Sequence, residues 1–244
     1  MSQDPPRIKP SSGSAVEHSS EHAPEPSDNA CPRSGPRARR SRGRPSSEAA
    51  QGADALLRTA RGIFARRGYE ATSVRDIARQ AGVDAALIAH HFGSKEALWI
   101  AVVDQIAARI HPLLEVATEL RSRADLSPRK RVEQAMVHFM DKVFEDPDIG
   151  MFFSTAATEE GARLDVLVDR MVKPFHQVFL PLMEDAMAAG DFQGCDPGLM
   201  FSMLTQGISK TVAYAHVLRA VSPLTHDPET FKRELLKVVL TLLA

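Results

Sequence analysis

Apolar residues recur at helical spacing from about residue 53 to the end of the chain, whereas the first 47 residues show no such pattern. The first periodic segment places Leu56, Ala60, Ile63 and Phe64 on one helical face, which predicts a helix over 53–67. Later segments repeat this spacing, and none shows the strict alternation expected of a half-buried strand. The pattern predicts an all-α protein.

The segment TSVRDIARQAGVDAALIAHHF predicts two short helices joined by a tight turn. Ser73 is a natural N-cap for the first helix, Gly82 supplies the turn, and Asp84 caps the second helix. Either Leu87 or Ile88 must face inward from the second helix. This spacing is typical of a helix-turn-helix unit.

Ser94 caps a fourth predicted helix, which runs from Lys95 to about His111, where Pro112 is expected to kink or restart it. Phe92 and Trp99 are expected to be core or domain-interface residues. Later apolar stripes predict further helices over about 128–145, 149–158, 162–189, 198–220 and 227–243.

Composition divides the chain into three parts. Residues 1–47 are rich in Pro, Ser, Gly, Glu and Arg and are expected to be a disordered extension, with a basic arm at 33–44. Residues 48–98 are expected to form the helix-turn-helix domain. Residues 99–244 are expected to form an all-α regulatory and dimerisation domain.

Positive charge is concentrated in residues 33–100, although the formal net charge of the chain is −1. The twelve residues of the basic arm include six arginines and no acidic residue, which favours contact with a polyanion. The stretch RGRP resembles the core of an AT-hook and predicts entry into a narrow minor groove. A solubilising tail is the alternative. The arginines proposed to contact DNA are Arg37, Arg39, Arg40, Arg42 and Arg44.

Other function classes have little support in the sequence. It contains no phosphate-cradling glycine loop, no H-E-x-x-H motif and no recognisable carboxylate pair, so neither an enzyme, a cofactor nor a metal site is expected. Its two cysteines lie at neither metal-ligand nor disulfide-framework spacings, and no apolar run approaches eighteen residues. We therefore expect a cytoplasmic protein without a membrane partner.

Residues 56–98, LLRTARGIFARRGYEATSVRDIARQAGVDAALIAHHFGSKEAL, resemble the N-terminal domain of the tetracycline-repressor-like (TetR) family of bacterial transcription regulators. The resemblance implies phosphate contacts by three residues and places five more along the recognition helix: Thr72, Ser73 and Lys95, and Ala85, Ala86, Leu87, His90 and His91. For the two histidines, DNA contact and simple capping of the helix end remain equal alternatives. The alanines cannot hydrogen-bond a base edge, so modest specificity per half-site is expected.

The same resemblance implies a homodimer on double-stranded DNA, with a small-molecule effector bound in the C-terminal domain. Helices 162–189 and 198–220 are expected to form the dimer interface, because each has more apolar surface than one internal core needs. The candidate lining of the effector pocket is apolar or aromatic: Phe139, Phe144, Met151, Phe152, Phe175, His176 and Phe179.

The function predicted from these features is a ligand-responsive repressor that binds an inverted-repeat operator as a dimer. A small apolar or aromatic effector is expected to release it. The alternative is an architectural, nucleoid-associated protein that relies on the arginine-rich arm and has no effector.

Overall fold

The computed structural model describes residues 47–192 and 195–243, so the arginines of the basic arm lie outside the described residues. All regular structure in these ranges is helical, which confirms the all-α prediction. The elements are α1 Ser47–Arg67, α2 Val74–Ala81, α3 Ala85–Phe92, α4 Lys95–Ser122, α5 Pro128–Glu145, α6 Pro147–Ala156, α7 Ala162–Leu167, the π-helical η1 Val168–Val172, α8 Lys173–Ala188, α9 Pro197–Ala213, α10 Ala215–Leu218, the 3₁₀ turn η2 Pro223–His226 and α11 Pro228–Leu242.

The first three helices pack around a core that also involves α4. Ile63 and Phe64 of α1, Ile77 of α2 and Ile88 of α3 are buried together with Trp99. The same cluster includes Phe152 of α6, so the core continues beyond residue 98. The domain boundary expected at residue 98 therefore lies within α4.

Helix α4 runs without a break through Pro112 to Ser122, eleven residues beyond the expected end at His111. Ile110 and Leu113 are both buried, so the inward face is preserved across the proline. Tertiary packing of this face stabilises the helix despite the lost backbone hydrogen bond. By length and composition α4 could cross a membrane, but a core helix of a soluble protein passes the same test, so this is weak evidence.

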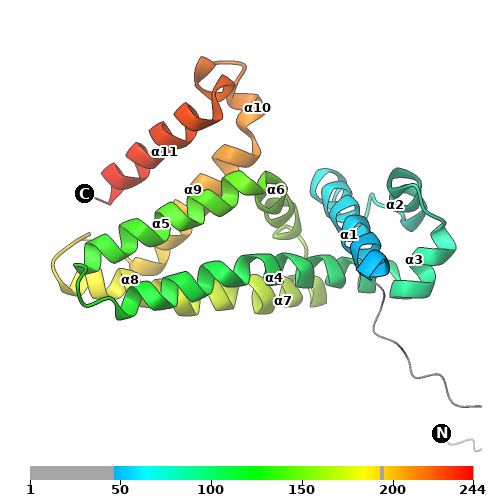
Figure 1. Ribbon diagram of the computed structural model, residues 1–244, viewed down its shortest axis with the longest axis horizontal. Helices are drawn as coiled ribbons and strands as arrows, with labels where there is room; N and C mark the ends of the chain where they lie inside the picture. The colour runs from blue at the N-terminus through cyan, green and yellow to red at the C-terminus, as the bar shows by residue number, and fades with distance from the viewer. Residues whose placement is uncertain (1–46, 193–194, 244) are drawn as a thin grey trace, which may run out of the picture. The chain divides into compact units, whose positions relative to one another are not determined.

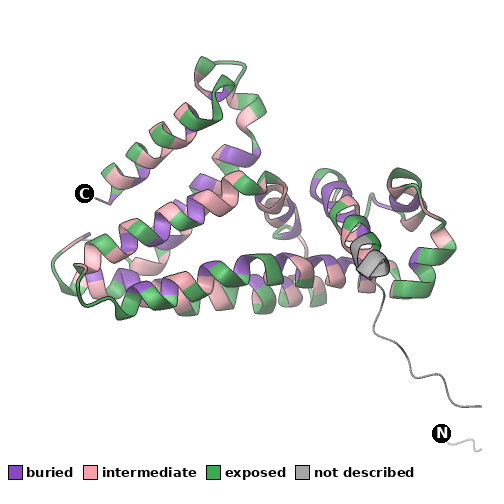
Figure 2. Cartoon of the chain, viewed as in Figure 1, coloured by how far each residue is buried: buried purple, intermediate pink, exposed green. Residues whose placement is uncertain are grey.

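A second core lies between α4, α5, α8 and α9 (Figure 1). Met136, Phe179 and Leu204 are among its buried residues. Figure 2 shows buried positions on the facing sides of these helices, whereas α11 carries mainly exposed and intermediate positions. This second core supports the walls of the cavity described below.

Two predicted helices are interrupted. The helix expected over 162–189 contains a π-helical turn immediately before Lys173–Pro174, where proline cannot donate the regular backbone hydrogen bond and a widened turn accommodates its ring. The helix expected over 198–220 breaks at Tyr214, whose φ of −105° and ψ of 24° are not helical. Sequence periodicity does not detect such local breaks, because the apolar spacing continues across them.

Candidate functional site

The helix-turn-helix forms as the sequence predicts, and each boundary has a local cause. Ser73 caps α2 by accepting from the backbone N–H of Asp76, and its hydroxyl also donates to the Asp76 carboxylate. This hydrogen bond from Ser73 lowers the pKa of Asp76. Gly82 adopts a left-handed φ of 67° between the helices, and Asp84 caps α3 through the N–H of Ala86.

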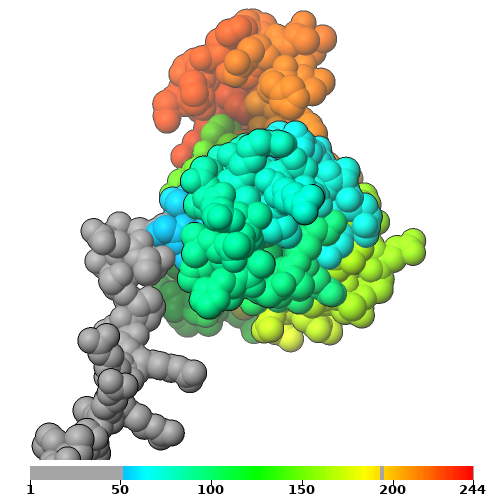
Figure 3. Space-filling model, turned by 90° about the vertical axis from the view of Figure 1, so that its right-hand side faces the viewer, coloured from blue at the N-terminus to red at the C-terminus, as the bar shows by residue number. Residues whose placement is uncertain are grey.

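Helix α3 presents one exposed side and one buried side. Ile88 is only 1% exposed and resolves the choice left open by the sequence, since Leu87 is 43% exposed. Ala86, His90 and His91 are also exposed, and Ala85 is half-buried against the core. Figure 3 shows α2 and α3 (cyan to green) on one continuous face of the molecule. A major groove admits an α-helix, so the exposed side of α3 is the candidate surface for DNA contact.

The C-terminal end of α3 is capped by a backbone hydrogen bond. The N–H of Gly93 donates to the carbonyl oxygen of Ala89 at 2.9 Å. The rings of His90 and His91 lie edge to face, with their centroids 5.6 Å apart, on the exposed surface. The structure shows no hydrogen bond from either histidine to the end of α3 among the described residues, and DNA contact by the two histidines stays a prediction.

Two of the residues expected to contact phosphates make hydrogen bonds within the protein. Thr72 is 2% exposed, and its hydroxyl donates to the carbonyl oxygen of Gly68 at 2.7 Å. The Lys95 ammonium donates to the carbonyl oxygens of Tyr69 and Thr72 at 2.8 and 3.0 Å. Both side chains hold the turn between α1 and α2, so Ser73 is the exposed member of the trio.

Tyr69 joins the helix-turn-helix to α7. The Lys95 ammonium and the Arg163 guanidinium each lie 4.0 Å from the centroid of its ring. Arg163 also pairs with Glu70 at 3.0 Å, which adds a charged contact between the same two parts. Burial raises the pKa of the Tyr69 hydroxyl. The α1–α2 turn is therefore fixed from both sides.

A cavity of about 530 Å³ lies within the C-terminal helices, and this volume is in the range of small-molecule sites. Of the residues expected to line a pocket, the structure brings together Phe139, Phe175 and His176. The remaining walls come from α4, α5, α6 and α9 and include Ile110, Phe153, Phe201 and Thr205. The cavity is apolar on most sides.

Four expected pocket residues lie outside this lining. Phe152 is buried against Trp99, with ring centroids 5.9 Å apart, and Phe179 is buried in the second core between Phe175 and Phe201. Phe144 packs against Phe231 of α11, and Met151 packs against the first core. Helical spacing marks a residue as inward-facing and does not distinguish a cavity wall from a filled core.

The charged residues that line the cavity were not predicted from the sequence. Arg109 and Lys142 line the cavity, as do Glu145 and Asp146 at the α5–α6 junction and Lys210 of α9. The acidic residues stand in the motif EDPD, which the sequence marked only as a helix end. In the described part of the chain, no group of three or more His, Cys, Asp or Glu side chains could hold a metal ion.

Comparison with known proteins finds a family match over the helix-turn-helix region and the start of α4. Residues 56–102 match the family model described as bacterial regulatory proteins, tetR family. The HTH-type transcriptional repressor Rv3405c of Mycobacterium tuberculosis is 40% identical over 74 residues, which are 30% of this chain and 39% of that protein. The chain thus covers about two fifths of the length of this curated relative.

Solved structures share the fold over most of their length. A putative fatty acid metabolism regulator of Clostridium perfringens has a TM-score of 0.61 at 17% identity, over 78% of this chain and 96% of that one. FadR of Bacillus subtilis, solved in complex with stearoyl-CoA, has a TM-score of 0.56 at 14% identity, over 78% of this chain and 99% of that one. At these identities the similarity shows a common helical architecture.

Proposed function

We propose that this chain is a ligand-responsive repressor that binds an inverted-repeat operator as a homodimer, because residues 56–102 match the model of the tetR family of bacterial regulatory proteins. The observation that carries the proposal is the exposed side of α3, with Leu87, His90 and His91 outward, on a helix-turn-helix whose core extends to the helices around the cavity. We propose a cytoplasmic location and no catalytic activity.

The dimer is proposed because one recognition helix reads too few base pairs to select a genomic site. Helices α9 and α11 carry exposed apolar side chains suited to such an interface: Leu199, Met203, Val238 and Leu242. Most apolar residues of α8 pack inward, so we propose an interface on α9, within the expected segment 198–220, and on α11.

Small-molecule release is supported by the cavity of about 530 Å³. The FadR structure of the same fold contains stearoyl-CoA, a ligand with a long apolar chain, and the apolar walls here suit a ligand with an apolar or aromatic body. An effector that binds the DNA-free form more tightly would release DNA by population shift.

The test is selection of bound DNA from a random pool, with the full-length chain and with a form lacking residues 1–44, at two salt concentrations. We expect one inverted repeat from both forms, with weaker and less salt-sensitive binding by the truncated form, because its arm no longer contacts phosphates. Recovery of A/T-rich DNA alone, lost on truncation, would refute the proposal and support the architectural alternative.

A further inference from the structure

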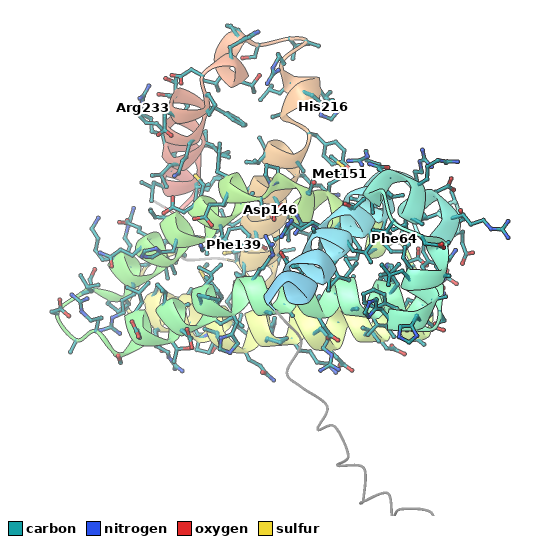
Figure 4. All side chains as sticks on the ribbon, turned by 45° about the vertical axis from the view of Figure 1, so that its right-hand side comes forward. Phe64, Phe139, Asp146, Met151, His216 and Arg233 are labelled. Carbon is teal, nitrogen blue, oxygen red and sulfur yellow. The ribbon has the colours of Figure 1, made fainter. Side chains whose placement is uncertain are left out.

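Asp146 connects the cavity to the DNA-binding helices. It lies at the α5–α6 junction, lines the cavity, and accepts from Arg61 Nη2 of α1 at 2.8 Å. The same carboxylate accepts from Arg109 Nη1 of α4 at 3.3 Å. Figure 4 labels Asp146 next to α1, with Phe139 of the cavity wall nearby. One side chain is thus shared by the cavity, α4 and α1.

The two contacts of Asp146 differ in strength. The distance of 2.8 Å to Arg61 is typical of a charge-assisted hydrogen bond, whereas 3.3 Å to Arg109 is long. Arg61 is 4% exposed, and Arg109 is 37% exposed. Arg109 is therefore the partner that an incoming group can take from Asp146.

Positive charge exceeds negative charge at this corner. Arg58, Arg61 and Arg109 share two carboxylates, those of Asp54 and Asp146. Arg61 Nε and Nη1 are buried and have no hydrogen-bond partner among the described residues. Such donors are costly to bury, and they leave the positive charge of Arg61 only partly balanced beside Asp146.

The rest of the cavity lining also carries an excess of positive charge. Lys142 is neutralised by Glu145 at 2.7 Å, whereas Lys210 has no ion pair within the described ranges. The facing walls are apolar, with Ile110, Phe175 and Phe201. The cavity therefore combines a cationic corner with an apolar interior.

We propose that the cavity binds an amphipathic anion, whose apolar body lies between these walls and whose carboxylate takes Arg109 from Asp146. This inference rests on the proposed function and names the effector class and the residues that sense it. An arginine binds a carboxylate through two parallel hydrogen bonds, a geometry that the long contact to Asp146 does not provide.

The same event carries the signal to DNA. Once the ligand carboxylate has taken Arg109, it lies close to Asp146, and like-charge repulsion acts on Asp146. Asp146 is bonded to Arg61, and Arg61 is part of the α1 surface that packs on α6. The repulsion therefore loosens the α1–α6 contact and shifts α1 together with the helix-turn-helix that packs on it.

The test uses three straight-chain probes of equal length: dodecanoate, dodecan-1-ol and dodecyltrimethylammonium, each below its micellar concentration. Binding to the full chain is followed through the fluorescence of its one tryptophan, Trp99, whose ring packs on Phe152 of α6. We expect dodecanoate to bind at least about tenfold more tightly than the alcohol, because it gains a charged hydrogen bond. Preference for the ammonium probe, or no saturable binding by any probe, overturns the inference.

Two variants identify the residues, and a third is the matched control. R109Q should reduce the preference for dodecanoate over the alcohol to less than about twofold, because the head-group bond is lost. R121Q changes an arginine of the same helix that pairs with Asp185 away from the cavity lining, and it should keep the preference. Equal loss in both variants would refute the role of Arg109.

The variant D146N tests whether Asp146 responds to the bound carboxylate or only stabilises the fold. Without the carboxylate, dodecanoate meets no competing anion and should bind several-fold more tightly, yet it should release less operator DNA. A residue with only a structural role would not raise affinity while lowering release. Operator binding without any probe tests the proposed function separately, so a chain that binds its operator but ignores dodecanoate refutes only the present inference.

Discussion

Lys95 has one role predicted from the sequence and another indicated by its contacts in the structure. The resemblance implied a phosphate contact, whereas the ammonium bonds two carbonyl oxygens and lies 4.0 Å from the Tyr69 ring centroid. The informative change is Lys95→Met, which keeps most of the side-chain volume and removes the charge and the donors. The two roles then predict different measurements.

The magnitude follows from the three contacts. A hydrogen bond from a charged donor contributes about 1.5–3 kcal/mol, and a cation over an aromatic ring contributes about 0.5–1 kcal/mol where it is exposed. Lys95 is half-buried, and water can partly replace its bonds to the carbonyl oxygens, so we expect a loss of about 2 kcal/mol in the free energy of unfolding. For a chain of this size that is a decrease of about 4–8 °C in Tm.

The assay pairs thermal unfolding with operator binding at several salt concentrations. We expect a lower Tm and an unchanged slope of log affinity against log salt. An unchanged Tm with a slope reduced by about 1 would show that Lys95 contacts a phosphate and would refute the structural role. Lys130→Met is the control, since Lys130 pairs with Glu133 on the surface of α5 and should leave both measurements near those of the wild type.

Three further predictions follow from burial. Ile88→Ala should lower the free energy of unfolding by about 2–5 kcal/mol in denaturant, whereas Leu87→Ala should weaken operator binding without lowering stability. Equal stability of the two variants would contradict the assigned buried face of α3. Phe152→Ala should cost about 3–5 kcal/mol of stability and leave the dodecanoate preference intact, whereas Phe175→Ala should weaken dodecanoate binding. Met203→Glu should produce a monomer in sedimentation equilibrium, and a persistent dimer would exclude the exposed face of α9 as the interface.

The helix-turn-helix could be predicted closely because its boundaries depend on local chemistry. Ser73, Gly82 and Asp84 cap or turn the backbone through contacts within a few residues, and the structure shows each of them. The end of α4 could not be predicted in this way. Pro112 disfavours a helix locally, and only packing of Ile110 and Leu113 against other elements outweighs it.

The cavity depends on contacts between distant parts of the chain, and the sequence identified it only in part. Phe175 and Phe179 lie one helical turn apart on α8 and look equivalent as a pattern, yet only Phe175 lines the cavity. Asp146 is more instructive, since its partners are 85 and 37 residues away in the sequence. A single sequence contains no signal for such pairs, because spacing predicts neighbours on one helix and not between helices.

The size of the proposed signal can be compared with what release from DNA requires. A second carboxylate about 4 Å from Asp146 would raise its energy by about 4 kcal/mol at an effective dielectric constant of about 20, before Arg61 and Arg109 offset part of it. Moving a two-state equilibrium from 1:99 to 99:1 takes about 5.5 kcal/mol. The head group alone therefore supplies part of a full switch, and the apolar body must supply the rest by fitting the released form of the cavity better. An anion without a chain, such as acetate, should bind the corner weakly and release little DNA, since it provides only the electrostatic part.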